Sequence, residues 1–300
     1  MSVVPLPYPA IDSPADRAAR LSNAVIAAYL AATIWPMAEY TRSSGDIVPL
    51  LIHLGALAAA ISVVAVTQPA VRRLRDLLPL LLGPFLYVEL RWLIPGTGRP
   101  HHDALVLAWE RSLFGGTPSS AWAPAMPWLP LSELLHLAYA SYYAIVLVPP
   151  IVLYLRGRRP EFAATMLALT IVYGACFTTY LLFPVDGPRY LVGPANAPVG
   201  PVRTFVLHLL QAGSSRGTAF PSSHVAAAVV ASLCALTFQR RIGVVAALLT
   251  VGLTAGTVYG GFHYAVDALV GALLGVACWL VARRAWRSFS LARQSATAAS

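Results

Sequence analysis

The sequence contains no lysine, and only 11% of its 300 residues are charged. Arginine therefore supplies the basic side chains, and 58% of the residues are hydrophobic, too many for an ordinary soluble domain of this length. Cysteine is also scarce. Cys176, Cys234 and Cys278 each lie in an apolar run, at spacings that suit neither a disulfide framework nor a metal site. This composition indicates that lipid, rather than water, is the main solvent of the chain.

Eight long apolar runs are separated by short breaks that contain Arg and Pro, as expected when each run crosses a hydrocarbon slab about 30 Å thick. Because no water satisfies backbone groups there, and because the runs lack the alternation of barrel strands, all eight should be helices. We therefore expect an all-α, polytopic membrane bundle. The predicted spans are Leu21–Tyr40, Ile47–Gln68, Leu77–Ile94, Leu131–Leu155, Phe162–Phe183, Ser222–Phe238, Ile242–Tyr259 and Tyr264–Val281.

Arginine is distributed unevenly between the two sides of this predicted bundle. Eight spans place both termini on one side, and most of the 21 arginines fall on that side. The positive-inside rule then puts the termini in the cytoplasm, in a bacterial-type plasma membrane. Although the formal charge is +9, the arginines form short clusters at span ends rather than one basic face. The expected partner is thus the lipid bilayer, with no nucleic acid.

The spans and the segments between them define the predicted organisation. We expect a cytoplasmic arm over residues 1–20, two additional spans over 21–76, a six-helix core over 77–282 and a cytoplasmic tail over 283–300. Within the core, residues 96–130 should hold an interfacial helix at Asp103–Phe114, because apolar side chains recur there at four-residue spacing. His101 and His102 precede Asp103, but adjacent residues rarely face one ion and a third ligand at suitable spacing is missing. No metal site and no cofactor are expected.

Ionisable residues lie at the ends of three predicted spans. Arg189 follows the fifth span, His224 opens the sixth, and His263 and Asp267 open the eighth. The predicted topology places these three ends on the same, non-cytoplasmic side. Since ionisable groups at membrane depth are costly, this convergence points to a functional site.

The start of the sixth span has the features of a phosphate-binding helix end. Pro221 suits a first helical turn, and Ser222 and Ser223 would offer N–H groups and hydroxyls at the positive end of the helix dipole. His224 would then lie beside the anion and could pass a proton to a leaving oxygen.

His263 and Asp267 are four residues apart, so a helix would place both side chains on one face. The carboxylate could accept a hydrogen bond from one imidazole nitrogen and leave the other free to attack phosphorus. Gly271 and Gly275 continue this face, which predicts a closely packed neighbouring helix beneath the pair.

The motifs Pro221-Ser-Ser-His224 and His263-Tyr-Ala-Val-Asp267 resemble the second and third motifs of the type 2 phosphatidic acid phosphatase superfamily. The resemblance implies a six-helix core over roughly two-thirds of the chain. It also implies that His263 is the nucleophile that forms a phosphohistidine, that Asp267 orients it, and that His224 is the general acid. Arg189 would bind the phosphoryl oxygens, and no metal is implied.

The sequence departs from the phosphatase pattern at two places. Gly256-Thr257 stands where the resemblance leads us to expect a Ser-Arg pair, and a first motif with an upstream lysine is absent near Arg189. Arg216 could substitute for the missing arginine. These departures are more similar to the inositol phosphorylceramide synthase and sphingomyelin synthase branch, an inositolphosphotransferase-like group.

The functional hypothesis is an integral-membrane phosphoesterase or phosphotransferase that acts on a membrane lipid, with water or an alcohol as acceptor. A transporter or flippase is an alternative, in which Arg189, His224 and Asp267 would line a permeation path, but it would need more polar residues through the bilayer depth. A catalytically silent scaffold is the third possibility. The lipid, the acceptor and the oligomeric state stay open at this stage.

Overall fold

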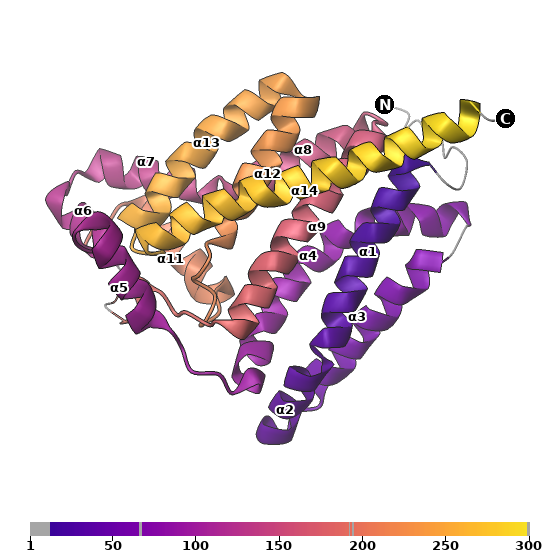
Figure 1. Ribbon diagram of the computed structural model, residues 1–300. Coiled ribbons are helices and arrows are strands. Elements are labelled where there is room, and N and C mark those ends of the chain that lie inside the picture. Colours follow the sequence, from indigo (N-terminus) through magenta and orange to yellow (C-terminus); the bar gives the residue numbers. More distant parts are fainter. Residues whose placement is uncertain (1–12, 66–67, 192, 194, 299–300) are drawn as a thin grey trace.

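The computed structural model describes residues 13–65, 68–191, 193 and 195–298, and this part of the chain is helical without β-strands (Figure 1). This confirms the predicted all-α class. The helices are α1 Pro14–Ala32, α2 Ile34–Ser44, α3 Val48–Ala65, α4 Pro69–Thr97, α5 Asp103–Phe114, α6 Pro118–Ala125, α7 Leu129–Ala140, α8 Tyr142–Leu155, α9 Arg159–Leu182, α10 Pro188–Leu191, α11 Pro201–Gly213, α12 Ser223–Phe238, α13 Arg240–Tyr259 and α14 Ala265–Ala298.

Among the described residues, five segments are long and apolar enough to cross a membrane, and α1 with α2 adds a sixth if this pair, bent by 41°, is one span. The five are Val71–Thr97, Leu129–Leu155, Arg159–Leu182, Arg240–Tyr259 and Ala265–Leu291. The other two predicted spans correspond to the shorter apolar helices α3 and α12. The 16 residues of α12 rise only about 24 Å, less than the hydrocarbon thickness of about 30 Å. The chain is an integral membrane helical bundle.

The first helix begins earlier than the sequence predicted. Residues 14–20, assigned to a cytoplasmic arm, belong to α1, and residues 1–12 lie outside the described part. Ser13 caps the helix, Pro14 occupies its first turn, and the Asp16 N–H donates to the Ser13 hydroxyl at 3.2 Å. This cap favours helix from Pro14 onward, since proline fixes the backbone and the serine oxygen accepts a free N–H.

The last helix also runs further than predicted. The expected tail over 283–300 is helical as far as Ala298, and only residues 299–300 lie outside the description. Ala15 and Ala18 of α1 pack in one cluster with Trp286 and Phe289 of α14. The start of α1 and the C-terminal part of α14 therefore lie at the same end of the bundle, as Figure 1 shows.

A buried network of charges joins the starts of α1, α4 and α9. The carboxylate of Asp16 lies 2.8 Å from Arg72, 2.7 Å from Arg75 and 2.8 Å from Arg159. Arg159 also pairs with Asp76 at 2.6 Å. Buried charges are costly unless they are paired, so this network fixes how the N-terminal helices sit against α9.

The packing of α12 on α14 depends on the two glycines noted in the sequence. A Cβ atom at Gly271 would lie 2.5 Å from the Ser222 carbonyl oxygen, and one at Gly275 would lie 2.6 Å from that of Ala226. Only glycine permits this approach. The prediction of close packing is confirmed, and the contact brings the start of α12, with His224, next to the start of α14.

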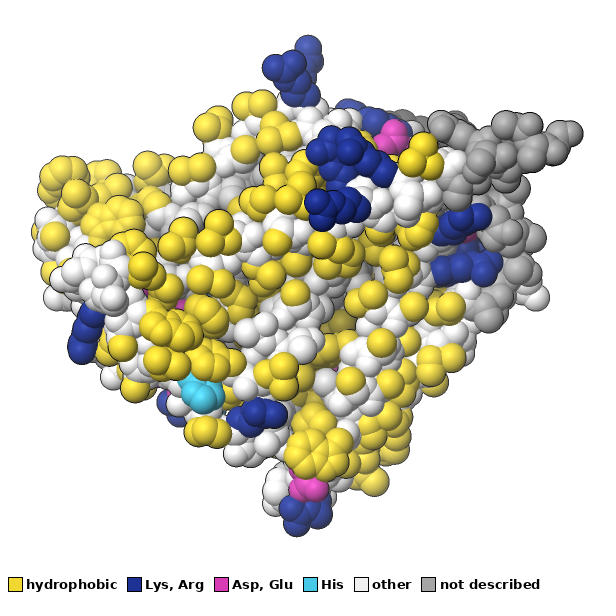
Figure 2. All heavy atoms as spheres, in the orientation of Figure 1, with side chains coloured by type: hydrophobic (Ala, Val, Ile, Leu, Met, Phe, Trp, Pro, Cys, Tyr) yellow, Lys and Arg dark blue, Asp and Glu magenta, His cyan; other side chains and the backbone are white. Residues whose placement is uncertain are grey.

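Hydrophobic side chains cover much of the visible lateral face of the bundle, while arginines gather toward its ends (Figure 2). This distribution fits helices surrounded by lipid. The helix predicted at Asp103–Phe114 is confirmed as α5, and its interfacial position stays a prediction. Together with α6 and α11 it lies at the end of the bundle away from the termini (Figure 1).

Candidate active site

Three of the predicted site residues line one small pocket. Arg189 comes from α10, His224 from the first turn of α12, and His263 from the loop between α13 and α14. The pocket has a volume of about 40 Å³, and the ring centroids of the two histidines are 5.9 Å apart. Segments that are separated along the chain thus meet at one cavity, as the topology argument predicted.

The orientation of His263 differs in one respect from the sequence expectation. Its Nδ1 lies 3.0 Å from the Ala219 carbonyl oxygen, whereas the nearest oxygen of Asp267 is 3.6 Å away. A carbonyl oxygen only accepts, so Nδ1 carries the proton and Nε2 has the lone pair. The tautomer expected for a nucleophile is present, but a backbone carbonyl is the hydrogen-bond acceptor that fixes it.

Asp267 lies beneath this ring and organises the loop before α14. Its carboxylate accepts the Tyr264 N–H at 2.8 Å, and its carbonyl accepts the Ser222 N–H at 3.0 Å. The residue is completely buried. Asp267 therefore places a carboxylate close to His263 and ties the start of α14 to the start of α12.

The electrostatic surroundings of His263 favour the neutral imidazole. Burial, together with the positive charge of Arg189, lowers the pKa of His263 to about 4, although the hydrogen bond to Ala219 acts in the opposite direction. An unprotonated ring at neutral pH is the form that can donate a lone pair.

His224 is held between two aromatic rings. Its ring stacks on Tyr139 and lies 4.4 Å from the ring of Tyr142, measured between centroids. Its Nε2 is 3.4 Å from the Tyr139 hydroxyl. This packing restricts the orientation of the imidazole opposite His263.

Arg189 reaches the pocket beside a group of hydroxyls. Its guanidinium donates to the Tyr190 hydroxyl at 2.6 Å and to the Ser214 hydroxyl, and the two hydroxyls lie 2.9 Å apart. Arginine presents several N–H donors in a planar fork, which suits phosphoryl oxygens. The position of Arg189 agrees with its predicted place at the site.

Ser222 and Ser223 do not face this pocket in the predicted way. The helix begins at Ser223, one residue later than the predicted span, with Ser222 as its N-cap, and the Ser222 hydroxyl accepts the Val225 N–H. The Ser222 N–H donates to Asp267, and the Ser223 N–H donates to the Tyr180 hydroxyl at 3.1 Å. Because these donors bind inside the protein, neither serine N–H is free for phosphate; Ser223 instead lines a neighbouring apolar cavity.

Arg216 also differs from the expectation. Its guanidinium lies 3.1 Å from the Asp186 carboxylate, and its side chain is 64% exposed. It stacks over the Tyr190 ring rather than lining the pocket. The structure thus places Arg189, but not Arg216, at the pocket.

Two aspartates connect the loops that carry the pocket. Both oxygens of Asp103 accept backbone N–H groups, from Asp186 at 3.0 Å and from Gly187 at 2.8 Å. Asp186 in turn accepts the Gly217 N–H at 2.8 Å. The Ala219 N–H donates to the Val185 carbonyl at 2.8 Å, so the loop that carries Arg189 is bonded to the loop that carries Ala219.

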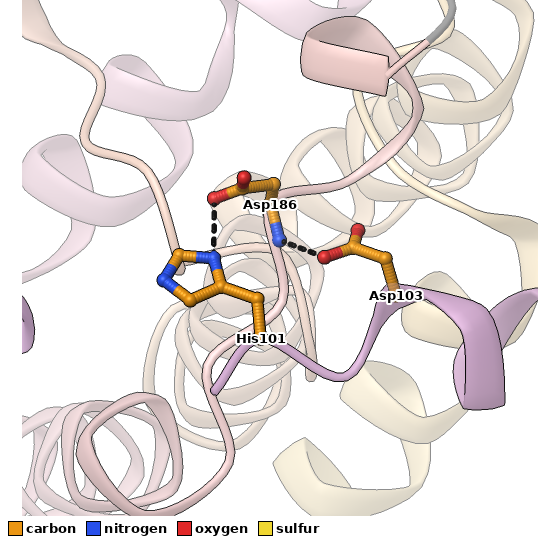
Figure 3. Close-up of side chains that lie close together, drawn as sticks. All are labelled: His101, Asp103 and Asp186. Carbon is orange, nitrogen blue, oxygen red and sulfur yellow. Dashed lines mark hydrogen bonds and ion pairs between the residues drawn. The ribbon is translucent and has the colours of Figure 1, made fainter. Parts of the chain in front are cut away.

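The same aspartates lie close to His101 (Figure 3). Ligand atoms of His101, Asp103 and Asp186 are within 4.8 Å of one another, a group that could hold a metal ion. The sequence argument that a third ligand is missing is therefore wrong, because Asp186 supplies it from a distant segment. In the structure the His101 Nδ1 lies 2.8 Å from the Asp186 carboxylate, and the Asp103 carboxylate accepts the backbone N–H of Asp186.

Several pocket residues were not predicted from the sequence. Tyr87, Tyr139, Tyr190, Ser214 and Thr218 line the pocket together with the histidines. The hydroxyl group of each of these residues can donate a hydrogen bond. No sequence motif marks them, and Tyr87 comes from α4, far upstream of the two histidine motifs.

A larger cavity of about 310 Å³ adjoins the pocket. Tyr87, Tyr139, Leu210, Ser214 and His224 line both spaces. Most of the remaining lining is aliphatic or aromatic. The histidine site therefore has a polar chamber on one side and an apolar chamber on the other.

Comparison with known proteins identifies the family. A family model described as the PAP2 superfamily matches residues 104–281, which is more than half of the 300-residue chain. No curated protein and no solved structure matches the chain significantly. The matched region contains Arg189, His224, His263 and Asp267. The chain belongs to the PAP2 superfamily.

Proposed function

We propose that this protein is an integral-membrane phosphoesterase that acts on a lipid phosphate or phospholipid through a phosphohistidine at His263. Members of the PAP2 superfamily are phosphatases and phosphotransferases, which supports an enzyme of this type. The observation that carries the proposal is the joint position of His224, His263 and Arg189 around one pocket beside an apolar cavity.

In the first step, the lone pair on Nε2 of His263 attacks phosphorus, and the bond between phosphorus and the lipid oxygen breaks. Protonated His224 gives its proton to the departing oxygen, so the lipid leaves as an alcohol. An anionic phosphate beside His224 favours its protonated form. Arg189 stabilises the charge that develops on the phosphoryl oxygens.

In the second step, neutral His224 removes a proton from water or from an alcohol as its oxygen attacks the phosphohistidine. The bond between phosphorus and Nε2 breaks, and His263 is regenerated. With a lipid phosphate as substrate, water yields free phosphate and an alcohol yields a new phosphomonoester. With a phospholipid as substrate, water yields a phosphomonoester and an alcohol yields a new phosphodiester. Asp267 lowers the energy of the positively charged phosphohistidine through its nearby carboxylate.

The acceptor distinguishes a phosphatase from an inositol phosphorylceramide synthase-like transferase. Both reactions share the first step, and the reduced arginine set of the sequence is the feature that favours transfer. Thr257 stands where an additional arginine was expected, and the buried Gly256 next to it packs against the backbone of Leu135. The proposal therefore includes either acceptor.

Transport receives less support from the arrangement of polar residues. The buried pair His53 and Glu89 is bonded across 3.0 Å, and Asp16 is paired with arginines at the opposite end of α1. Neither group lines the two cavities described above. A permeation path would require polar side chains that follow one another across the bilayer.

The test uses purified protein in nanodiscs with a panel of lipid phosphates and phospholipids, with and without candidate alcohols. Free phosphate and new headgroup lipids are both measured. His263→Ala and His224→Ala should abolish turnover, while His208→Ala, at an exposed position of α11, serves as the matched control. Unchanged turnover in either catalytic variant would contradict the proposal.

A further inference from the structure

The apolar cavity beside His224 is lined by helices inside the region that the family model matches and by helices outside it. Its floor is a single face of α9, with side chains that recur at three- and four-residue spacing. Both α4 and α8 pack on α9 and form the cavity's two sides. The floor residues are Met166, Leu169, Thr170, Tyr173, Gly174 and Phe177.

The dimensions of the floor suit one hydrocarbon chain. From Met166 to Phe177 the helix rises about 16 Å, roughly half of the 30 Å hydrocarbon thickness and therefore the depth of one leaflet. The volume of about 310 Å³ is at the lower end of the range for small-molecule sites. A single chain from one leaflet fits these limits better than two chains.

The cavity has an open side between α4 and α8. Gly83 and Pro84 line it on α4, and Tyr143, which is 50% exposed, lines it on α8. A Cβ atom at Gly83 would find no other heavy atom within 4 Å. Since both helices belong to candidate spans, this opening faces lipid, and a chain can enter from the side.

The inner end of the cavity meets the catalytic pocket at His224. In the reaction proposed above, His224 protonates the oxygen of the leaving group. A hydrocarbon chain in the cavity is therefore attached to that oxygen, while the phosphoryl group occupies the polar pocket with Arg189 and His263.

The walls include residues from outside the region of family similarity. The cavity is lined by Val25, Ile26 and Tyr29 of α1 and by Pro79, Leu80, Gly83, Pro84, Leu86, Tyr87 and Val88 of α4, whereas the family match begins at residue 104. The N-terminal helices thus close a space that the matched region leaves open on this side.

We propose that this cavity binds one hydrocarbon chain of the leaving group, entering between α4 and α8, and that α1 and α4 set the chain length that fits. The inference rests on the proposed function, because it takes His224 as the acid. The inference assigns selection of the chain length to Gly83 and to the α1 side chains, which lie outside the two histidine motifs.

The first experiment compares kcat/KM for lipid phosphates whose single chains range from short to leaflet length. Gly83→Phe should lower the ratio of long-chain to short-chain kcat/KM by about tenfold, the loss expected when a few buried methylene groups are displaced. Gly55→Phe is the matched control, since Gly55 lies on α3 with open space around it and does not line the cavity. An unchanged ratio in Gly83→Phe would overturn the inference.

A second measurement does not depend on turnover. A lipid phosphate with a photoreactive group at the end of its chain is bound to the His263→Ala variant and cross-linked, and the labelled peptides are identified by mass spectrometry. Label on α1, α4 or α9 near the cavity supports the inference, and label confined to other helices overturns it. Absence of turnover by the native protein on every substrate would instead contradict the proposed function.

Discussion

The Nδ1 nitrogen of His263 is 3.0 Å from the carbonyl oxygen of Ala219 and 3.6 Å from the nearer carboxylate oxygen of Asp267. A backbone carbonyl cannot be protonated or removed by side-chain substitution, so it fixes the tautomer of the ring independently of Asp267. In the mechanism proposed above, the carboxylate is left with an electrostatic role toward the phosphohistidine, and in the structure it accepts the Tyr264 N–H.

This division of roles predicts the effect of Asp267→Asn. The amide oxygen can still accept the Tyr264 N–H, and Ala219 still holds the proton on Nδ1 of His263. We expect kcat to fall by much less than the roughly 10⁴-fold loss that follows when a carboxylate alone fixes the tautomer of a catalytic histidine. Steady-state kinetics with His263→Ala as reference measure this. A loss as large as that of His263→Ala would show that Asp267 fixes the ring.

The pH dependence follows from the low pKa of His263. A ring with a pKa of about 4 remains unprotonated at pH 5 to 6, where an ordinary histidine is largely protonated. The acid-side decline of kcat/KM that reports His263 should therefore be centred near pH 4. Arg189→Gln removes a positive charge that lowers this pKa, so the decline should move to higher pH.

The acid-side decline of kcat/KM is measured from pH 3.5 to 8 on a substrate whose leaving group has a low pKa. Such a leaving group departs without protonation by His224, so the decline reports His263 alone. The His208→Ala variant should give the same profile as the native protein. A decline centred near pH 6.5 in the native protein would contradict the environment described for His263.

Asp103 should act as a positioning residue for the pocket. Both of its oxygens accept N–H groups, so Asp103→Asn places an NH₂ group against a backbone donor of Asp186 or Gly187. The loops that carry Arg189 and Ala219 then lose one of their connections. We expect kcat to fall by about tenfold, in the range found when supporting hydrogen bonds of a site are removed.

The matched control is Asp46→Asn, because Asp46 also accepts a backbone N–H, from Val48, but at an exposed position outside the site. Asp103→Glu keeps the charge and tests whether geometry is required. Equal kcat in Asp103→Asn and in the control would exclude the positioning role.

The charge network at the other end of the bundle should govern stability. Asp16→Asn removes a buried negative charge that faces three arginines and should destabilise the protein by roughly 3 kcal/mol or more. Glu39→Gln, which breaks an exposed pair with Arg42, should change stability little. Thermal unfolding in detergent measures both; similar melting temperatures for the two variants would show that the buried network is not stabilising.

The sequence predicted those features that follow from local pattern. Apolar runs identified the helices. The motifs around His224 and His263 attracted attention because ionisable residues at span ends are rare and costly, and the fold brings both histidines to one pocket. The packing of α12 on α14 was also visible in the spacing of Gly271 and Gly275.

Features that depend on contacts between distant segments were missed. Asp186 lies beside Asp103 only after the chain folds, so neither the loop connection nor the possible metal-binding group with His101 is visible in the spacing. The N–H groups of Ser222 and Ser223 were predicted to bind phosphate, but they donate to the Asp267 carbonyl and to the Tyr180 hydroxyl instead. The bond from His263 to Ala219 likewise joins two segments that no pattern relates.

The central claim is that His263 carries the phosphoryl group, and the most direct measurement is to trap it. The purified protein is mixed with a radiolabelled phosphate ester that has a low-pKa leaving group, quenched in alkali, in which phosphohistidine survives, and digested for mass spectrometry. We predict acid-labile label on His263, a higher yield in His224→Ala because the second step lacks its base, and none in His263→Ala. Label on another residue, or full turnover in His263→Ala, would contradict the account.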